Sequence, residues 1–388
     1  MKKLFFTFII YILFTNNTFA ETLVSSEEIY RINGAQVFVL DKSYNGKLNE
    51  YFKEISERGI DTVFFRVFHN SKDRSHLGIE PACESGVYYE TEHACTVNNL
   101  LGEVVKAAHD NNVKLYAWMA TRSLSFLKTK ENISMSLSAS GSDVEGYGAN
   151  IFKKEVRDTL LGLFEDLAKY EIDGILFQDD FIIKYSEGSD KYAASLFKEE
   201  TGIEVKKESF FNKIKEYNGR KLFSEYNENF YVWAEWKDTQ LSLLFKELKE
   251  RAKTHNPKIK FAANIYYETP IHEKEALSWY SQKMSTLKEA GADYFAVMGY
   301  FEQISDEQKL ARVESAEYIG NIAAAAVKAV GNEKAVIMKL QSKSFQGKGM
   351  LSYDDYKLVC RRVKLAGNVS YAVVPVISPD DIYTCPVQ

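Results

Sequence analysis

Apolar runs alternate with amphipathic stretches along most of this chain. The apolar runs are Gln36–Asp41, Thr62–Phe68, Lys114–Ala120, Gly174–Asp180, Lys260–Tyr266, Tyr294–Tyr300, Ala335–Gln341 and Asn368–Val376. The amphipathic stretches between them include Lys47–Arg58, Val97–Asn111, Phe152–Tyr170, Val232–His255, Lys274–Ala290 and Tyr353–Ala366. Alternation of strands and helices predicts a parallel sheet. Eight repeats favour a (β/α)8 TIM-like barrel over an open doubly wound sheet. No GxGxxG or GxxxxGK[ST] motif follows the first run, which weakens the nucleotide-binding alternative.

Two regions depart from this alternation. Asn70–Cys95, after the second predicted strand, is a long loop, and Lys184–Asn229, after the fourth, has the composition of added helices. Both insertions follow the carboxyl ends of strands, and in a barrel the active site lies on that side. Since there is no Pro/Ser-rich linker and no internal repeat, residues 21–388 are predicted to form one domain.

Polar residues end several of the predicted strands. The run from Asp173 is apolar up to Phe177 and then continues as Gln178, Asp179 and Asp180. Charged groups at the end of a buried strand cost free energy unless they are paired or have a task. The alternative is that the two aspartates cap a helix or a turn.

Side-chain alternation along each strand places these polar residues on one face. The face carries Arg66, Gln178, Asp180, Asn264, Tyr266, Tyr300, Lys339 and Gln341, and Glu302 extends it if the sixth strand runs on. Asp179 falls on the opposite face, so Asp180 is the predicted inward carboxylate. We therefore expect Asp180, Asn264, Tyr300 and Gln341 to share one cleft.

Asp179, Asp180 and Glu302 form a carboxylate cluster if the barrel closes. Hydrolysis of a glycosidic bond commonly uses one carboxylic acid to protonate the leaving oxygen and a second carboxylate to activate water or stabilise charge. Asp180 is the predicted general acid. For Glu302 the alternative is a solvated loop acid.

Aromatic and basic residues complete the candidate site. Trp118, Tyr266, Tyr300 and Tyr88 could stack on sugar rings, although core packing is the commoner use of such residues. Lys339 would pair with a catalytic or a structural acid. No GxSxG, Cys–His pairing or HExxH motif is present, and we predict neither a metal site nor a cofactor.

The first residues predict export. Lys2 and Lys3 precede the apolar run Leu4–Phe14, and small residues end with Ala20. This pattern is typical of a cleaved secretory signal peptide over residues 1–20 and is too short for a membrane span. The protein is then periplasmic or secreted, and Cys83, Cys95, Cys360 and Cys385 could form two disulfides. Of the three connectivities, the sequence-local pairs Cys83–Cys95 and Cys360–Cys385 are our prediction.

Charge narrows the class of ligand. The formal net charge of the 388 residues is −5, and removal of Lys2 and Lys3 with the leader makes it −7. An acidic exported protein is a poor candidate for nucleic-acid binding. A neutral or cationic ligand in an acidic groove is expected instead.

Several short motifs occur in the order seen in a known family. Lys114–Met119 (KLYAWM), Asp173–Asp180 and Tyr294–Glu302 (YFAVMGYFE) resemble the glycoside hydrolase domain at the C-terminus of PgaB-type proteins, which process poly-β-1,6-N-acetylglucosamine. Further similarity lies at Glu235–Lys237, Asn264–Tyr266, Trp279–Gln282, Leu340–Gln341 and Ser378–Asp381, so the resemblance runs from about Ile32 to Asp381.

The resemblance implies a (β/α) barrel that cleaves the partly de-N-acetylated polymer in an endo manner. The family's paired aspartates correspond to Asp179 and Asp180, and its acid after the sixth strand corresponds to Glu302. Two departures matter: Gln178 stands where the family usually has His, and the family's deacetylase domain is not expected here. The alternatives are a non-catalytic polysaccharide-binding barrel that assists exopolysaccharide export machinery, and a hydrolase of another bacterial glycan.

Overall fold

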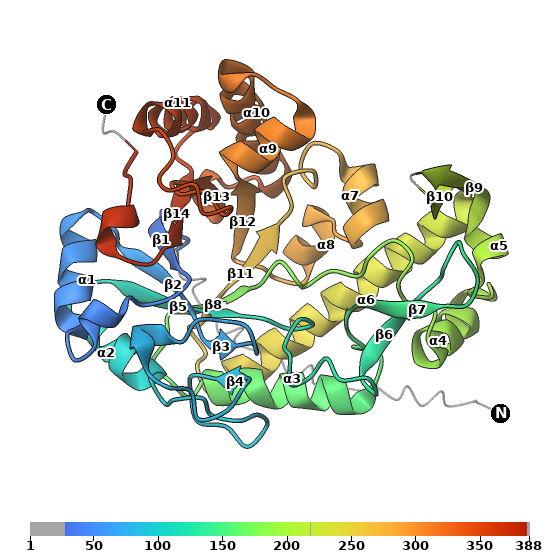
Figure 1. The fold of residues 1–388 in the computed structure, drawn as a ribbon, viewed down its shortest axis with the longest axis horizontal. Helices are drawn as coiled ribbons and strands as arrows, with labels where there is room; N and C mark the ends of the chain where they lie inside the picture. Colours follow the sequence, from blue (N-terminus) through green and yellow to red (C-terminus); the bar gives the residue numbers. More distant parts are fainter. Residues whose placement is uncertain (1–27, 218, 386–388) are drawn as a thin grey trace, which may run out of the picture.

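The eight barrel strands close into a single parallel sheet. The computed structural model describes residues 28–217 and 219–385, so the predicted signal peptide lies outside the described residues. The strand order is β1-β14-β13-β12-β11-β8-β5-β2, and β1 pairs with both β14 and β2 (Figure 1). The (β/α)8 prediction is confirmed, and the open doubly wound alternative is wrong.

Each predicted strand overlaps one strand of the barrel. These are β1 (Asn33–Val37), β2 (Thr62–Arg66), β5 (Lys114–Met119), β8 (Gly174–Phe177), β11 (Lys260–Ile265), β12 (Tyr294–Gly299), β13 (Val336–Gln341) and β14 (Ser370–Val376). The predicted fourth strand extended to Asp180, but β8 ends at Phe177. Gln178, Asp179 and Asp180 therefore follow the strand, which changes where their side chains point.

Helices surround this sheet. They are α1 (Leu48–Glu57), α2 (Leu101–Asp110), α3 (Lys154–Leu167), α6 (Glu228–Lys253), α7 (Glu273–Tyr280), α8 (Met284–Glu289), α9 (Phe301–Gln308), α10 (Arg312–Val330) and α11 (Tyr353–Val363). The predicted helix Lys274–Ala290 is two helices, because α7 ends at Tyr280 and the next residue, Ser281, is in the left-handed conformation (φ 51°). Short 3-10 turns occur at Lys42–Tyr44, His76–Gly78, Glu333–Ala335, Lys364–Ala366 and Pro379–Asp381.

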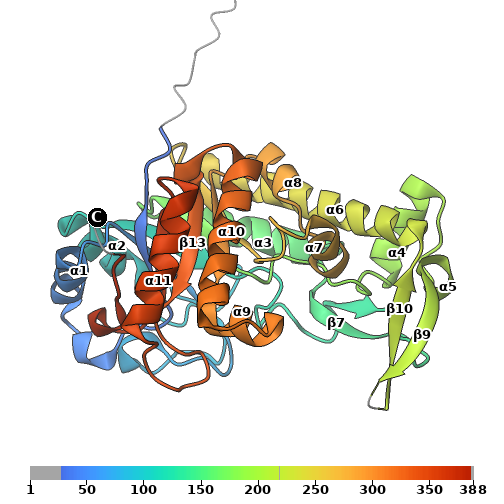
Figure 2. The same ribbon diagram turned by 90° about the horizontal axis from the view of Figure 1, so that it is seen from above.

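Three insertions leave the carboxyl ends of the strands, one more than predicted. The first holds β3 (Phe68–His69) and β4 (Gly86–Val87), and the second, which the sequence did not reveal, holds the hairpin β6 (Ile133–Ser136) and β7 (Val144–Ala149). The third holds α4 (Lys191–Thr201), α5 (Lys207–Phe210) and the hairpin β9 (Phe211–Tyr217) and β10 (Arg220–Tyr226). This third insertion was predicted to be helical, but half of it is the hairpin, which projects at one end of the molecule in Figure 2.

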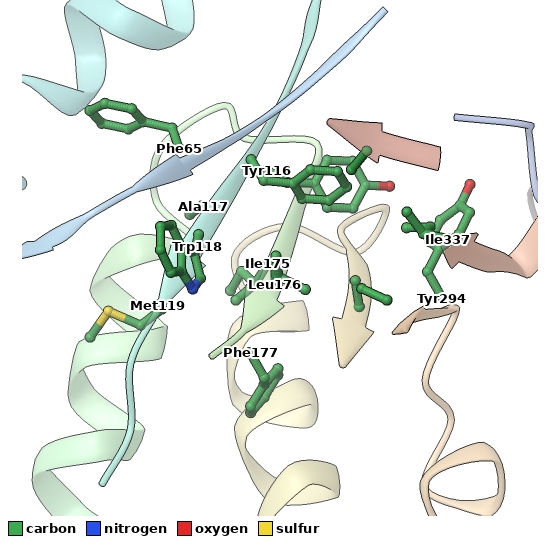
Figure 3. Packing of buried hydrophobic residues seen from close by; sticks show 14 of the residues in the cluster. Phe65, Tyr116, Ala117, Trp118, Met119, Ile175, Leu176, Phe177, Tyr294 and Ile337 are labelled. Atoms are coloured by element: carbon green, nitrogen blue, oxygen red, sulfur yellow. The ribbon is translucent and has the colours of Figure 1, made fainter. Parts of the chain in front are cut away.

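The barrel interior is packed with large side chains and is closed where the strands begin. Tyr116 and Tyr294 face the interior with Trp118, Leu176 and Ile337 (Figure 3). The hydroxyls of Tyr30 and Tyr116 are hydrogen-bonded at 2.9 Å, and the Tyr294 hydroxyl donates to the Tyr30 carbonyl at 3.0 Å. These tyrosines fill the barrel interior at the amino end, and the active site of such barrels lies at the carboxyl end.

The third insertion has an aromatic core of its own. Phe210 stacks on Trp233 at 4.4 Å between ring centroids, and Phe197 contacts Trp236 at 5.2 Å. Trp233 and Trp236 belong to the first half of α6, whereas Leu244 and Leu248 in its second half pack into the barrel core. One helix of 26 residues, about 39 Å long, therefore serves both cores.

Both predicted disulfides are confirmed. Cys83–Cys95 joins the first insertion to itself with Cα atoms 6.6 Å apart, and Cys360–Cys385 ties the last described residues to α11 at 5.5 Å. Both distances lie within the range that a disulfide permits. None of the helices in the described part of the chain is long and apolar enough to cross a membrane.

Candidate active site

A cleft of about 390 Å³ opens at the carboxyl end of the barrel. Its lining consists of Gln36, Phe38, Arg66, Phe68, Asn70, Asp73, Trp118, Gln178, Asp179, Asn264, Tyr300, Gln303, Lys339 and Phe345. Clefts of this size at a barrel mouth commonly bind small ligands or single units of a polymer. A larger hollow of about 720 Å³ lies at the opposite end, beside Lys114, Asp173 and Lys260. We place the site in the smaller cleft because buried polar side chains from most of the strands converge there.

The structure brings seven of the predicted site residues together in this lining. They are Arg66, Trp118, Gln178, Asp179, Asn264, Tyr300 and Lys339. Their convergence follows from the alternation of side chains along parallel strands whose carboxyl ends meet at one rim. Asp180, Glu302, Gln341 and Tyr266 do not belong to the lining.

Asp179 presents its carboxyl group to the cleft from the turn that follows β8. Its backbone carbonyl accepts a hydrogen bond from the Tyr266 hydroxyl at 3.1 Å, which fixes the turn. Burial raises the pKa of the Asp179 carboxyl, the Lys339 charge opposes this, and the Asp180 charge adds to it. The net shift is upward, so the carboxyl keeps its proton to higher pH than an exposed aspartate does.

Asp180 points away from the cleft, so the prediction that it is the inward carboxylate is wrong. It is fully buried and accepts hydrogen bonds from the backbone N–H of Thr121 (2.9 Å) and of Ser123 (2.7 Å), and from both hydroxyls (3.0 and 2.8 Å). The physical reason is that β8 ends at Phe177 and strand alternation does not extend through the turn. Asp180 fixes the segment after β5.

Lys339 and Asn264 form a buried polar pair beside Asp179. The Lys339 ammonium donates to Asn264 Oδ1 at 2.8 Å and lies 5.4 Å from the centroid of the Tyr300 ring. Asn264 Nδ2 donates in turn to the Phe177 carbonyl at 2.9 Å. Burial lowers the pKa of Lys339 to about 7, against the opposing influence of the Asp179 carboxylate. The charge of the cleft therefore changes near neutral pH.

Glu302 and Gln341 pair with each other outside the lining. β12 does not run on to Glu302, which lies in the first turn of α9. Gln341 Nε2 donates to Glu302 Oε2 at 3.0 Å, and Gln341 Oε1 accepts from the Glu302 N–H at 3.0 Å. The expectation that Gln341 shares a cleft with Asp180 is therefore wrong, since neither residue lines the cleft.

The predicted stacking platforms have different surroundings. The Tyr266 ring is stacked on Tyr280 at 3.9 Å and 16°, so one of its faces is covered. Tyr88 is buried, and its hydroxyl is hydrogen-bonded to His69 Nδ1 at 3.0 Å, which makes it a core residue. Trp118 and Tyr300 line the cleft.

Sequence reasoning missed several lining residues, among them Gln36, Phe38, Asp73 and Phe345. Asp73 forms an ion pair with Arg66 at 3.3 Å and comes from the first insertion, whose folding the sequence does not specify. The sequence could have pointed to Gln36, because an amide in the apolar run Gln36–Asp41 is as unusual as Gln178 in the run Gly174–Asp180.

The lining contains buried polar atoms that lack a hydrogen-bond partner in the structure. They are Gln36 Nε2 and Oε1, Arg66 Nε, Trp118 Nε1 and Gln178 Oε1. Buried polar groups are nearly always paired, and an unpaired set in one cleft marks a place where a ligand or water completes the bonding. Arg66 and Lys339 balance Asp73 and Asp179 in formal charge, so the predicted acidic groove is not found in this lining.

The described residues include no group of three or more His, Cys, Asp or Glu side chains placed to hold a metal ion. The chemistry available in the cleft is that of one carboxyl group with a raised pKa, a lysine, amides and aromatic rings.

The chain is similar in fold to several solved glycosidases. The chain is similar to the PgaB (BpsB) glycoside hydrolase domain from Bordetella bronchiseptica, with a TM-score of 0.70 and 17% identity over 89% of this chain and 94% of that domain. It is also similar in fold to a β-galactosidase from Halorubrum lacusprofundi (TM-score 0.62, 8% identity, 88% of this chain and 52% of that one). The catalytic domain of β-amylase from Paenibacillus polymyxa gives a TM-score of 0.55 at 8% identity, over 91% and 94% of the two chains.

No curated protein matches the chain. A family profile does match, over residues 39–373, which includes all of the cleft except Gln36 and Phe38. The chain therefore belongs to hypothetical glycosyl hydrolase family 13.

Proposed function

We propose that this glycoside hydrolase cleaves partly de-N-acetylated poly-β-1,6-N-acetylglucosamine, or a related amino-sugar polysaccharide, in an endo manner, with Asp179 as the general acid. The observation that carries the proposal is the Asp179 carboxyl in the cleft, whose pKa burial raises. A general acid must be protonated near the working pH and must face the substrate. The likeness in fold to the PgaB hydrolase domain supports this choice of substrate class.

The second catalytic role falls to the substrate in this proposal. Asp73, the other acid of the lining, is already paired with Arg66. The acetamido oxygen of an N-acetylated unit attacks C1 while Asp179 gives its proton to the leaving glycosidic oxygen, and the C1–O bond breaks. Water then opens the cyclic intermediate at C1 and returns a proton to Asp179, so the balance is one glycosidic bond hydrolysed per water. Glu302, held by Gln341, remains the alternative base for a direct attack by water.

Export forms part of the proposal. A signal peptide over residues 1–20 would send the chain to the periplasm or outside the cell, and two disulfides are typical of such compartments. Exopolysaccharide export machinery is then a candidate partner.

The direct test measures cleavage of partly de-N-acetylated β-1,6-linked oligomers by mass spectrometry of the products. Asp179→Asn is expected to lower turnover by roughly 10²–10⁴-fold, the usual contribution of a general acid, and to leave oligomer binding within a few-fold. Asp306→Asn, an exposed acid on α9, is the control and should cleave like the wild type. Near wild-type turnover by Asp179→Asn would exclude Asp179 as the acid.

A second candidate function is binding without cleavage. It is favoured by Gln178, which stands where the PgaB-type motif usually has His and which lines the cleft with its Oε1 unpartnered. Wild-type protein that binds the oligomers and releases no product would establish this function. A panel of other bacterial glycans in the same assay would reveal a hydrolase with another substrate.

A further inference from the structure

Gln36 is a buried amide that the cleft leaves unpaired. It lies on β1 between apolar neighbours, is 1% exposed, and contributes to the lining. Neither its Nε2 nor its Oε1 has a hydrogen-bond partner in the structure. The residue beside it on β2 is Phe64, whose side chain cannot supply one.

An amide in this position costs free energy that a Leu or Met of similar size would not. Asp180 and Asn264, two other buried polar residues at the same rim, are hydrogen-bonded within the protein. Gln36 therefore differs from Asp180, which holds the segment after β5, and from Asn264, which pairs with Lys339 in the lining. Its position is explained if a ligand in the cleft completes its bonding.

The chemistry of a primary amide specifies the complementary group. Gln36 offers an N–H donor and a carbonyl acceptor side by side, and a secondary amide offers a carbonyl and an N–H to match them. An ammonium group has only donors, so it could not accept the hydrogen bond that Gln36 Nε2 offers.

The remaining walls near this amide suit an acetyl group. Trp118 adds an unpartnered Nε1–H donor for a carbonyl oxygen. The Phe38 ring lies 4.8 Å from Trp118 and 6.1 Å from Phe345, between ring centroids, and these apolar surfaces can hold a methyl group.

We infer that Gln36 recognises the acetamido group of an N-acetylated hexosamine unit bound in the cleft, and so discriminates that unit from its de-N-acetylated form. The inference rests on the proposed function and assigns a specificity residue within that site. Gln36 does not take part in bond breaking in this scheme.

The test compares two β-1,6-linked oligomer series, one fully N-acetylated and one with free amines at alternate units. Gln36→Leu keeps the volume and removes both hydrogen-bonding groups. We expect kcat/KM for the N-acetylated series to fall by about 10–100-fold, as expected for loss of hydrogen bonds to a buried substrate group, while the other series changes less. Gln308→Leu, at the exposed end of α9, is the matched control and should keep the wild-type preference.

Two measurements keep the inference separate from the proposed function. Titration calorimetry with a non-cleaved N-acetylglucosamine oligomer reports binding whether or not turnover occurs, and Gln36→Leu should weaken it. The thermal midpoint should stay unchanged or rise, because an unpaired buried group is removed. If the wild-type protein binds the oligomer but does not cleave it, the proposed hydrolysis is excluded and the role of Gln36 in binding is not. Unchanged binding and unchanged preference in Gln36→Leu would overturn the role of Gln36.

Discussion

Two clusters of buried polar groups lie near the barrel mouth, and they differ in whether the protein satisfies them. One surrounds Glu187 and Arg122, whose side chains are 0% and 1% exposed and form an ion pair. The other is the cleft, where five polar atoms of the lining are unpaired. The charged groups of the first cluster are fully hydrogen-bonded and hold the scaffold, whereas the unpaired atoms of the second face a cleft where a ligand could complete their bonding.

The Glu187 cluster joins the second and third insertions to α6. The Glu187 carboxylate accepts from the Ser134 hydroxyl, from the backbone N–H groups of Tyr147 and Lys184, and from Arg122. Burial acts to raise the pKa of Glu187, but Arg122 and these hydrogen bonds lower it overall.

Lys237 extends this cluster from α6. Its ammonium donates to the carbonyls of Lys184 and Tyr185 and lies 3.9 Å from the Trp233 ring centroid. Burial lowers the pKa of Lys237 to about 7, although Glu187 raises it. The charged groups Glu187, Arg122 and Lys237 all have hydrogen-bond partners, whereas the Trp233 Nε1–H has none.

The largest loss of stability is expected when the Glu187 cluster loses a charge. Glu187→Gln should lower the free energy of unfolding by about 3–5 kcal/mol, because it leaves Arg122 buried without its counter-ion. Urea titration measures this. Glu247→Gln, which breaks the half-exposed pair with Arg157, is the control and should cost less than about 1 kcal/mol.

The pH dependence of the free energy of unfolding provides a second test of the Glu187 cluster. The folded-state pKa of Glu187 is depressed below its unfolded value. Its stabilisation is therefore present above the unfolded pKa and is lost as the pH falls through the folded pKa. Glu187→Gln should remove this acid-side loss. An equal stability change for Glu187→Gln and Glu247→Gln would contradict the contrast between the clusters.

A smaller effect separates the two adjacent aspartates. Asp180→Asn should lower the free energy of unfolding by roughly 1–3 kcal/mol, because an amide cannot accept all four hydrogen bonds from Thr121 and Ser123. Asp179→Asn should leave stability unchanged or slightly higher near pH 7, since the raised pKa of Asp179 shows that burying its charge is unfavourable. Thermal and urea unfolding of both variants checks this. A larger loss of stability in Asp179→Asn than in Asp180→Asn would show that Asp179, rather than Asp180, holds the scaffold.

The smallest effect concerns the pH profile of the cleft. The Lys339 charge lowers the pKa of Asp179, against the dominant effect of burial. Lys339→Met should therefore raise that pKa and move the alkaline limb of kcat to higher pH. Lys283→Met, a lysine near Asp238 and outside the cleft, should leave the limb in place. Loss of the limb in Lys339→Met would show that Lys339 itself, rather than Asp179, causes it, and a limb that moves to lower pH would contradict the assigned effect of Lys339 on Asp179.

The sequence predicted the barrel and most of the rim because both depend on local periodicity. Alternation along β11 and β13 put Asn264 and Lys339 on the interior face, and both line the cleft. It failed at β8, where the strand ends three residues before Asp180 and a turn reverses the expected side. Gln341 follows the strand rule, but its pairing with Glu302 depends on α9, which the periodicity did not predict.

The rest of the site depends on tertiary packing that no local pattern encodes. Asp73 reaches the cleft through the first insertion, and Phe345 through the loop after β13. The β6–β7 hairpin was missed although residues 133–140 (ISMSLSAS) alternate apolar residues with serine, which is a local strand signal. Insertions take their shape from the cores they cover, and the aromatic core around Trp233 is visible only once α6 is in place.

The length of α6 also has a mechanical consequence. The insertion with β9 and β10 is attached by an unbroken helix whose other half packs into the barrel, rather than by a linker. A helix without a kink resists bending, and this one contains neither Pro nor Gly. The insertion therefore acts as a rigid arm beside the mouth of the barrel instead of a hinged flap. A long polymer bound across that mouth would contact an insertion whose position does not change. The insertion would therefore restrict the direction of the polymer chain already in the unbound protein.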